Sequence, residues 1–127
     1  MNDKRLRKLG GLIQGCLPPE FAGPEDAELL LVGWGSTRGA IEEAAAELKD
    51  QGRQAATCHF RQVWPLDQNH FLPRFERARQ VVMVEGNATG QFAKLIRRET
   101  GFEMSRLVLR YDGLPITPEY ILRQLAQ

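Results

Sequence analysis

The chain has 127 residues, of which 43% are hydrophobic and 26% are charged. These values are typical of one water-soluble globular domain that is long enough to bury its own core. Lys and Arg together number 17, against 16 for Asp and Glu, so no strong net field favours nucleic acid or an anionic membrane. We therefore expect neither nucleic acid nor a membrane among the partners.

Targeting segments and cysteine motifs are also missing from the sequence. No apolar run reaches the ~18 residues that cross a bilayer, and the stretch 10–17 is too short and too rich in glycine for a signal-peptide core. The cytoplasm is therefore the expected location. Cys16 and Cys58 lie far apart and form no C-x-x-C motif, which leaves no spacing for an iron–sulfur cluster or zinc. We expect both to be buried, reduced thiols.

The first predicted element is a short amphipathic helix within 1–17, where Leu6, Leu9 and Ile13 recur at helical spacing. A basic cluster over 4–8 lies in the same stretch. We interpret it as part of a solvated interdomain linker, with a nucleic-acid or membrane contact as the alternative. Prolines and a glycine then predict a loop over 17–26. We accordingly divide the chain into a linker, 1–17, and a domain, 18–127.

Beyond this loop the patterns of strands and helices alternate. Strands are predicted over 29–34, 55–60, 81–84 and 107–109. Helices are predicted over 35–50, from residue 73, over 89–99 and from residue 117 to the end. This alternation predicts an α/β sandwich with a parallel sheet. Right-handed crossovers with helices on both faces give the strand order second, first, third, fourth.

In such a sheet, ligands bind at the carboxyl ends of the strands, at the point where the winding reverses. The predicted order places this switch point between the strands 29–34 and 81–84, where two glycine-containing loops meet. Both loops lead into helix N-termini, which attract anions such as phosphate or carboxylate. The candidate residues for interdomain or anion contact are Trp34, Gly35, Ser36, Thr37, Glu85, Gly86, Asn87, Thr89, Gly90 and Gln91.

The same loops also allow a structural interpretation. Ser36 or Thr37 would cap the helix after the first loop. Asn87 or Thr89 would cap the helix after the second loop, and the surface would contact another domain. Glu85 ends a buried strand, and we interpret it as a structural or interface carboxylate, with acid–base chemistry in an assembled protein as the alternative.

The glycine spacing disfavours a dinucleotide site. Gly33, Gly35 and Gly39 have one residue too many before the third glycine of G-x-G-x-x-G, and no carboxylate ends the second strand. A Walker A loop, a G-x-S-x-G elbow and an H-E-x-x-H motif are also missing. We therefore assign no catalytic, cofactor-binding or metal-binding residue to this chain.

Four segments occur in a characteristic order: 28–37 continued by 39–41, then 59–66, 81–91 and 111–119. In this order they resemble the alpha subunit of 2-oxoacid:ferredoxin oxidoreductases, with the best match to the 2-oxoglutarate type. Residues 4–9 resemble the linker that precedes one domain of that subunit. The resemblance covers about residues 18–126, and four ordered motifs make it far more specific than any single one.

The resemblance implies a C-terminal domain similar to that of transketolase: a three-layer α/β/α sandwich with a mainly parallel sheet of four to five strands. Many relatives carry an additional antiparallel edge strand, which this sequence either lacks or forms from 12–17. The chain starts at Met1, just before this domain. It is therefore either a piece of a longer subunit or a separately made domain.

The family's holoenzyme oxidatively decarboxylates a 2-oxoacid onto coenzyme A and passes the electrons to ferredoxin. It uses thiamine diphosphate, Mg²⁺ and iron–sulfur clusters, and none of the corresponding motifs is present here. The resemblance therefore implies a non-catalytic role in assembly, with the remaining alpha-subunit domains and the beta subunit as partners and ferredoxin as a partner of the holoenzyme. The alternatives are a stand-alone nucleotide- or anion-binding module and a free-standing interaction protein such as a homodimer.

Overall fold

The computed structural model describes residues 17–126, and within them one mixed sheet contains five strands in the order β1-β3-β2-β4-β5. The strands are β1 (Glu20–Ala22), β2 (Leu29–Trp34), β3 (Ala55–Phe60), β4 (Gln80–Glu85) and β5 (Arg106–Leu109). The α-helices are α2 (Arg38–Asp50), α3 (Leu72–Arg77), α4 (Gln91–Thr100) and α5 (Pro118–Leu125). Two 3₁₀ turns, Gly35–Thr37 and Gln68–His70, precede α2 and α3.

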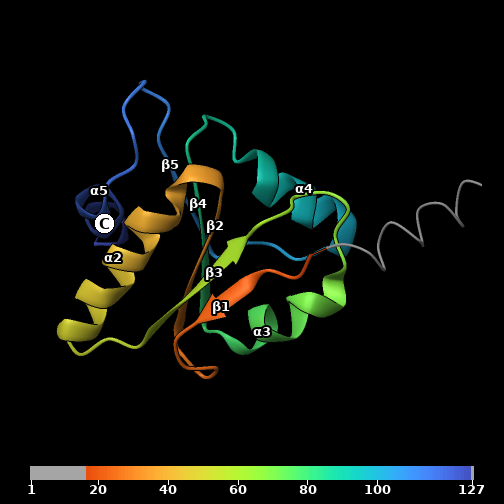
Figure 1. Ribbon diagram of the computed structural model, residues 1–127, viewed down its shortest axis with the longest axis horizontal. Helices are drawn as coiled ribbons and strands as arrows, with labels where there is room; N and C mark the ends of the chain where they lie inside the picture. Colours follow the sequence, from red (N-terminus) through yellow and green to blue (C-terminus); the bar gives the residue numbers. More distant parts are fainter. Residues whose placement is uncertain (1–16, 127) are drawn as a thin grey trace, which may run out of the picture.

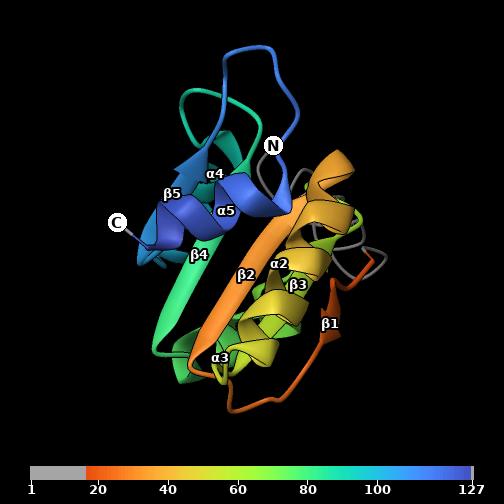
Figure 2. The same ribbon diagram turned by 90° about the vertical axis from the view of Figure 1, so that its left-hand side faces the viewer.

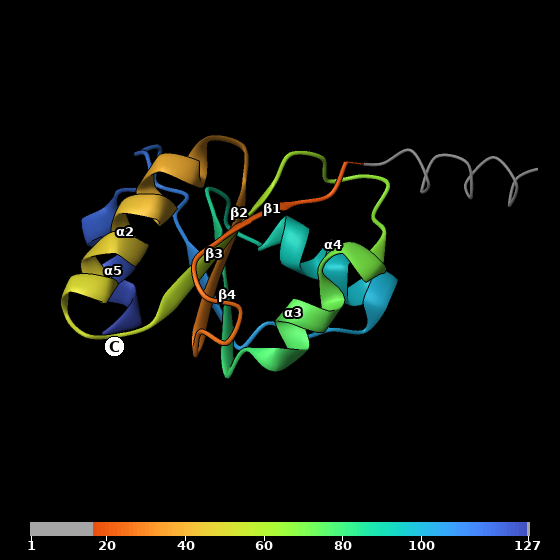
Figure 3. The same cartoon turned by 60° about the horizontal axis from the view of Figure 1, so that its bottom comes forward.

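The helices form two layers around the sheet (Figures 1 and 3). Helices α2 and α5 cover one face, and α3 and α4 cover the other. In α2 the residues Ile41, Ala44 and Leu48 recur every three or four positions and are buried, which is why this helix lies flat on the sheet. The three-layer α/β/α sandwich expected from the sequence is therefore confirmed.

The strand order follows the prediction from the crossover rule. Strand β2 lies at the centre of the sheet and pairs in parallel with β3 on one side and β4 on the other. Strand β5 then pairs in parallel with β4. Because β2 is covered on both faces, its first five residues are all buried, as expected for a continuous apolar run in a parallel sheet.

The antiparallel edge strand corrects one prediction. It is β1, which pairs with β3 so that Glu20 lies opposite His59, and it falls inside the segment 17–26 that we predicted to be a loop. Three residues are too few to show an alternating pattern, and the prolines on either side belong to an edge strand as readily as to a loop. Residues 1–16, which include the predicted N-terminal helix, the basic linker, Cys16 and most of the alternative strand 12–17, lie outside the described residues.

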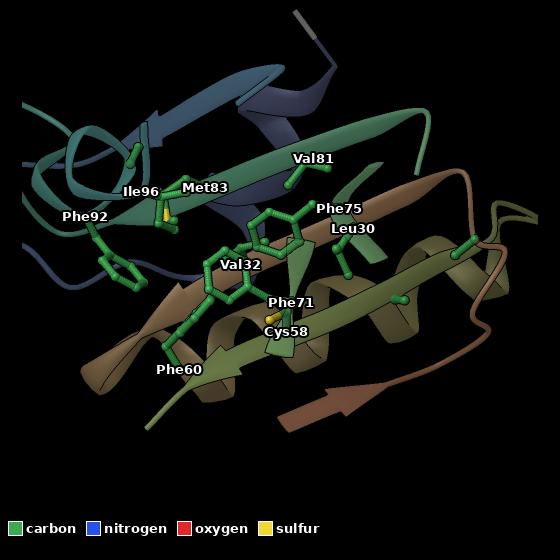
Figure 4. Close-up of a cluster of buried hydrophobic side chains, with 13 residues drawn as sticks. Leu30, Val32, Cys58, Phe60, Phe71, Phe75, Val81, Met83, Phe92 and Ile96 are labelled. Atoms are coloured by element: carbon green, nitrogen blue, oxygen red, sulfur yellow. The ribbon is translucent and has the colours of Figure 1, made fainter. Parts of the chain in front are cut away.

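Apolar side chains form a core on each face of the sheet. Figure 4 shows the core under α3 and α4, in which Phe60 contacts Phe92 and Phe71 edge-on, with ring centroids 4.8 and 5.2 Å apart. Cys58 lies in this core as a free, buried thiol, as predicted, and its burial raises its pKa. The second core packs the opposite face of the sheet against α2 and α5. No helix in the range 17–126 is long and apolar enough to cross a membrane.

Candidate interdomain contact site

The carboxyl ends of β2 and β4 open on a groove of about 500 Å³. Figure 2 shows the loops that follow β4 and β5 rising together at this end of the sheet. The groove therefore lies at the switch point that the strand order predicted. It is lined by Trp34, Gly35, Ser36, Thr37, Gly86, Asn87, Gln91, Leu114, Pro115 and Ile116.

Seven of the candidate residues named from the sequence line this groove, and three do not. Glu85 is buried beneath it with 1% of its surface exposed, Gly90 is also buried, and Thr89 is exposed to solvent outside it. The β5–α5 loop, which supplies the other lining residues, was missed because it lacks the glycine pairs that drew attention to the first two loops. The strand order itself was the available signal, because it places the end of β5 next to the end of β4.

Glu85 holds the base of the groove together through four hydrogen bonds. Its Oε1 accepts from the Phe92 backbone N–H at 2.8 Å, from Trp34 Nε1 at 3.1 Å and from Asn87 Nδ2 at 3.1 Å. Its Oε2 accepts from the Ala93 backbone N–H at 3.1 Å. The hydrogen-bonding capacity of this buried carboxylate is used by these structural contacts. The carboxylate also complements the positive end of α4. The geometry therefore favours the structural interpretation of Glu85.

The N-terminus of α4 is closed by the protein's own side chains. Besides the two bonds to Glu85, Asn87 Oδ1 accepts from the backbone N–H groups of Thr89, Gly90 and Gln91 at 3.1, 2.7 and 3.3 Å. The N-cap position of this helix is Gly90, so neither of the two residues expected to cap it occupies that position; Asn87 instead reaches the helix end from the loop before it, and Thr89 does not. An external anion would meet a buried carboxylate here, so we withdraw the expectation of an anion at this helix end.

At the N-terminus of α2 the expected caps do not form. Neither Ser36 nor Thr37 accepts a capping hydrogen bond; instead Thr37 Oγ1 donates to the Trp34 carbonyl at 3.0 Å. The reason is the 3₁₀ turn, which makes Thr37 helical already and points its hydroxyl back along the chain. A Cβ at Gly33 would clash with the side chains of Ile41 and Thr37, so glycine lets α2 pack this closely on β2.

The groove offers no group for catalysis or metal binding. Its lining side chains are neutral, and the described residues contain no cluster of three or more His, Cys, Asp or Glu that suits a metal ion. His59 lies on β3, away from the groove, where burial lowers its pKa. Cys58, with its raised pKa, stays a protonated thiol in the core. The described residues of the groove and its surroundings therefore do not fit thiamine diphosphate, Mg²⁺ or an iron–sulfur cluster.

Comparison with known families identifies the domain. Residues 23–115 match the model of the transketolase C-terminal domain. The chain is 40% identical over 123 residues to the alpha subunit of 2-oxoacid:ferredoxin oxidoreductase 1 from Aeropyrum pernix. That match covers 91% of this chain and 19% of the relative. It is also 40% identical over 101 residues to the 2-oxoglutarate oxidoreductase subunit KorA from Mycobacterium tuberculosis, covering 76% of this chain and 15% of that protein.

Solved structures show the same relationship. The 2-oxoglutarate:ferredoxin oxidoreductase from Magnetococcus marinus, with 2-oxoglutarate, coenzyme A and succinyl-CoA bound, matches with a TM-score of 0.88 and 28% identity. The match covers 99% of this chain and 22% of that chain. A chain from Thermoplasma acidophilum, the alpha chain of a probable 2-oxoacid ferredoxin oxidoreductase, matches with a TM-score of 0.60 and 28% identity, over 86% of this chain and 94% of that one.

The chain spans about a fifth of the length of curated relatives that it matches. The family model covers most of this chain, and the sheet order and layers agree with the fold. The similar curated proteins are oxidoreductase alpha subunits. The chain therefore belongs to the transketolase C-terminal domain family, in the form that occurs in the alpha subunits of 2-oxoacid:ferredoxin oxidoreductases.

Proposed function

We propose that this chain is the non-catalytic domain of a 2-oxoacid:ferredoxin oxidoreductase alpha subunit and that it acts in interdomain and subunit assembly. The observation that carries this proposal is the match to the Magnetococcus marinus enzyme, in which 99% of this chain corresponds to 22% of a longer chain. A domain reproduced so completely inside a larger enzyme has neighbours there that its own surface must fit.

The chemistry of the groove supports an assembly role over a catalytic one. Its lining contains neither an acid nor a base, and the carboxylate beneath it is already engaged by four donors. We propose that the loops containing Trp34, Ser36 and Asn87 contact another domain of the same subunit. Neutral side chains suit such a contact, because burying them does not require a charge to lose its water.

For the parent enzyme we propose the oxidative decarboxylation of a 2-oxoacid to its acyl-CoA, with 2-oxoglutarate as the expected substrate. The relative named for 2-oxoglutarate, and the solved enzyme with 2-oxoglutarate and coenzyme A bound, support this choice. Thiamine diphosphate, Mg²⁺, the iron–sulfur cluster and coenzyme A would be held by other parts of the enzyme. The remaining alpha-subunit domains, the beta subunit and ferredoxin are the proposed partners, and the cytoplasm is the proposed location.

Reconstitution tests this proposal. The alpha-subunit region that precedes this domain in the relatives, and the beta subunit, are produced from the same genome and mixed with the 127-residue chain. We expect a complex on size-exclusion chromatography and 2-oxoglutarate- and CoA-dependent reduction of ferredoxin that needs the chain. The chain alone should show no turnover. Failure to form a complex, or turnover by the isolated chain, would contradict the proposal.

A further inference from the structure

Exposed apolar side chains are concentrated at one edge of the domain. Among the described residues five large hydrophobic side chains are exposed, and three of them belong to β5 or the loop after it: Leu107 (42% exposed), Leu114 (58%) and Tyr111 (72%). The other two, Leu17 and Trp64, lie at the opposite side of the sheet, before β1 and after β3. Leu114 also lines the groove, so the loop after β5 borders the groove with an exposed apolar side chain.

The loop that carries Tyr111 and Leu114 is held in a defined shape. Asp112 Oδ1 accepts from Arg110 Nε at 3.0 Å and from the Leu114 backbone N–H at 3.1 Å. The Arg110 guanidinium lies over the Tyr120 ring, 4.6 Å from its centroid. The Arg110 hydrogen bond also lowers the pKa of Asp112, so the turn keeps its charged acceptor to a lower pH than an ordinary aspartate would. Two apolar side chains are thus presented to solvent on a fixed support.

Such an arrangement suits a protein contact. Ordering a loop on binding consumes part of the interaction energy, and a loop that is already ordered avoids that loss. Tyrosine is among the residues that most often dominate interfaces. The adjoining groove has no charged lining side chain, which fits a neutral protein surface and gives a phosphate backbone no Lys or Arg to pair with.

The comparison with the solved enzyme indicates the occupant. In the Magnetococcus marinus enzyme, nearly the whole of this fold makes up 22% of one longer chain. The rest of that longer chain is therefore available to pack against the domain. We propose that Tyr111 and Leu114 anchor this domain to another domain of the same alpha subunit, which covers the β5–α5 loop and the adjoining groove. This inference rests on the proposed function and adds which residues dominate the contact.

Two matched double variants test the inference. Tyr111→Ala with Leu114→Ala removes the proposed anchor. Trp64→Ala with Leu17→Ala removes one aromatic residue and one leucine of similar exposure elsewhere. The dissociation constant of each chain for the reconstituted complex of beta subunit and remaining alpha-subunit domains is measured by biolayer interferometry. We expect the anchor variant to weaken binding roughly 30-fold or more, as truncated interface anchors do, and the control variant to bind within about threefold of the unmodified chain.

Thermal midpoints of both variants should stay near that of the unmodified chain, since these side chains are exposed. Tyr111→Glu, which places a charge at the proposed contact instead of truncating the side chain to a methyl group, provides a second variant and should weaken binding as strongly. Equal binding by anchor and control variants would overturn the inference and leave the proposed function standing. No binding by the unmodified chain would remove both. Self-association in light scattering that the anchor variant abolishes would assign the surface to a second copy and overturn the inference.

Discussion

At the scale of single residues, Glu85 explains why the end of β4 is a rigid support. Its carboxylate joins Trp34 on one loop to Asn87 on the next and to the first turn of α4. Trp34 in turn packs edge-on against Phe92, with ring centroids 6.0 Å apart. One buried side chain therefore fixes the relative positions of the two loops that border the groove.

Replacing this carboxylate should destabilise the domain. Glu85→Gln keeps the volume but turns an amide N–H₂ towards at least one donor, so we expect a loss of roughly 1–3 kcal/mol in the free energy of unfolding. Glu85→Ala should cost more, because all four donors lose their acceptor. Urea unfolding followed by circular dichroism measures both effects. The exposed-site control Glu47→Gln should stay within about 0.5 kcal/mol, and a Glu85→Gln variant as stable as this control would contradict the account.

At the scale of elements, β1 is held at the sheet edge by more than its three-residue ladder. Glu20 accepts a hydrogen bond from Arg38 on α2 and lies 3.4 Å from Arg61 Nε, beyond the end of β3. Arg61 also donates to the Pro18 carbonyl at 3.1 Å. The hydrogen bond from Arg38 is the main reason that the pKa of Glu20 lies below its ordinary value. The strand is therefore tied to α2 and to the residue after β3 through a charged carboxylate as well as through its ladder.

Acid should loosen β1 before the rest of the sheet. Because the folded-state pKa of Glu20 is below its unfolded value of 4.5, its contribution is present above that pH and is lost as the pH falls through the folded-state value. We expect the amide protection factors of residues 20–22 to fall on acidification and in Glu20→Gln at neutral pH. Those of β4 should hardly change in the variant. Unchanged protection of residues 20–22 in Glu20→Gln would show that the backbone ladder alone holds the strand.

At the scale of the whole molecule, the two helix ends at the groove differ. The N-terminus of α4 is filled by Glu85 and Asn87, whereas the N-terminus of α2 has no side-chain cap and no acidic residue in its first turn. Only the N-terminus of α2 is an uncapped helix end that could attract an anion, as a stand-alone anion- or nucleotide-binding module would require. Assembly and ligand binding therefore make different predictions for the isolated chain.

The assembly role predicts that small anions do not stabilise the isolated chain. Its thermal midpoint should be the same with and without millimolar phosphate, ADP or coenzyme A. A ligand at 100 times its dissociation constant would instead add about 2.7 kcal/mol to the stability. A saturable rise that Ser36→Asp removes, by placing a carboxylate at the open end of α2, would favour the binding module.

Patterns that are local in the chain predicted most of the fold. Thr117 and Pro118 predicted the start of α5, where the Thr117 side chain does accept from the Tyr120 backbone N–H. The helices predicted over 35–50 and 89–99 are each followed within two residues by a glycine, Gly52 and Gly101, and both glycines adopt positive φ, at +84° and +79°. Four apolar runs and the crossover rule were sufficient for the order of the parallel strands. These features depend on backbone geometry and side-chain period, which a sequence displays directly.

Other features depend on contacts between residues far apart in the chain. The edge strand β1 forms because His59 and Cys58 of β3 offer it a free edge, and three residues carry no pattern of their own. Thr37 failed as a cap because the turn before α2 is a 3₁₀ turn. The β5–α5 loop lines the groove because it lies beside the β4–α4 loop at this end of the sheet (Figure 2).

The sequence by itself thus determined the fold class, the strand order, the position of the switch point and, through four ordered motifs, the family. Only the tertiary structure decided what the switch point contains. It placed the Glu85 carboxylate where an anion had been considered, left the α2 end uncapped and brought Leu114 to the same groove as Trp34. The physical reason is that strand and helix patterns report burial and backbone conformation, whereas hydrogen-bond partners and shared surfaces are set by how the loops pack once the sheet has formed.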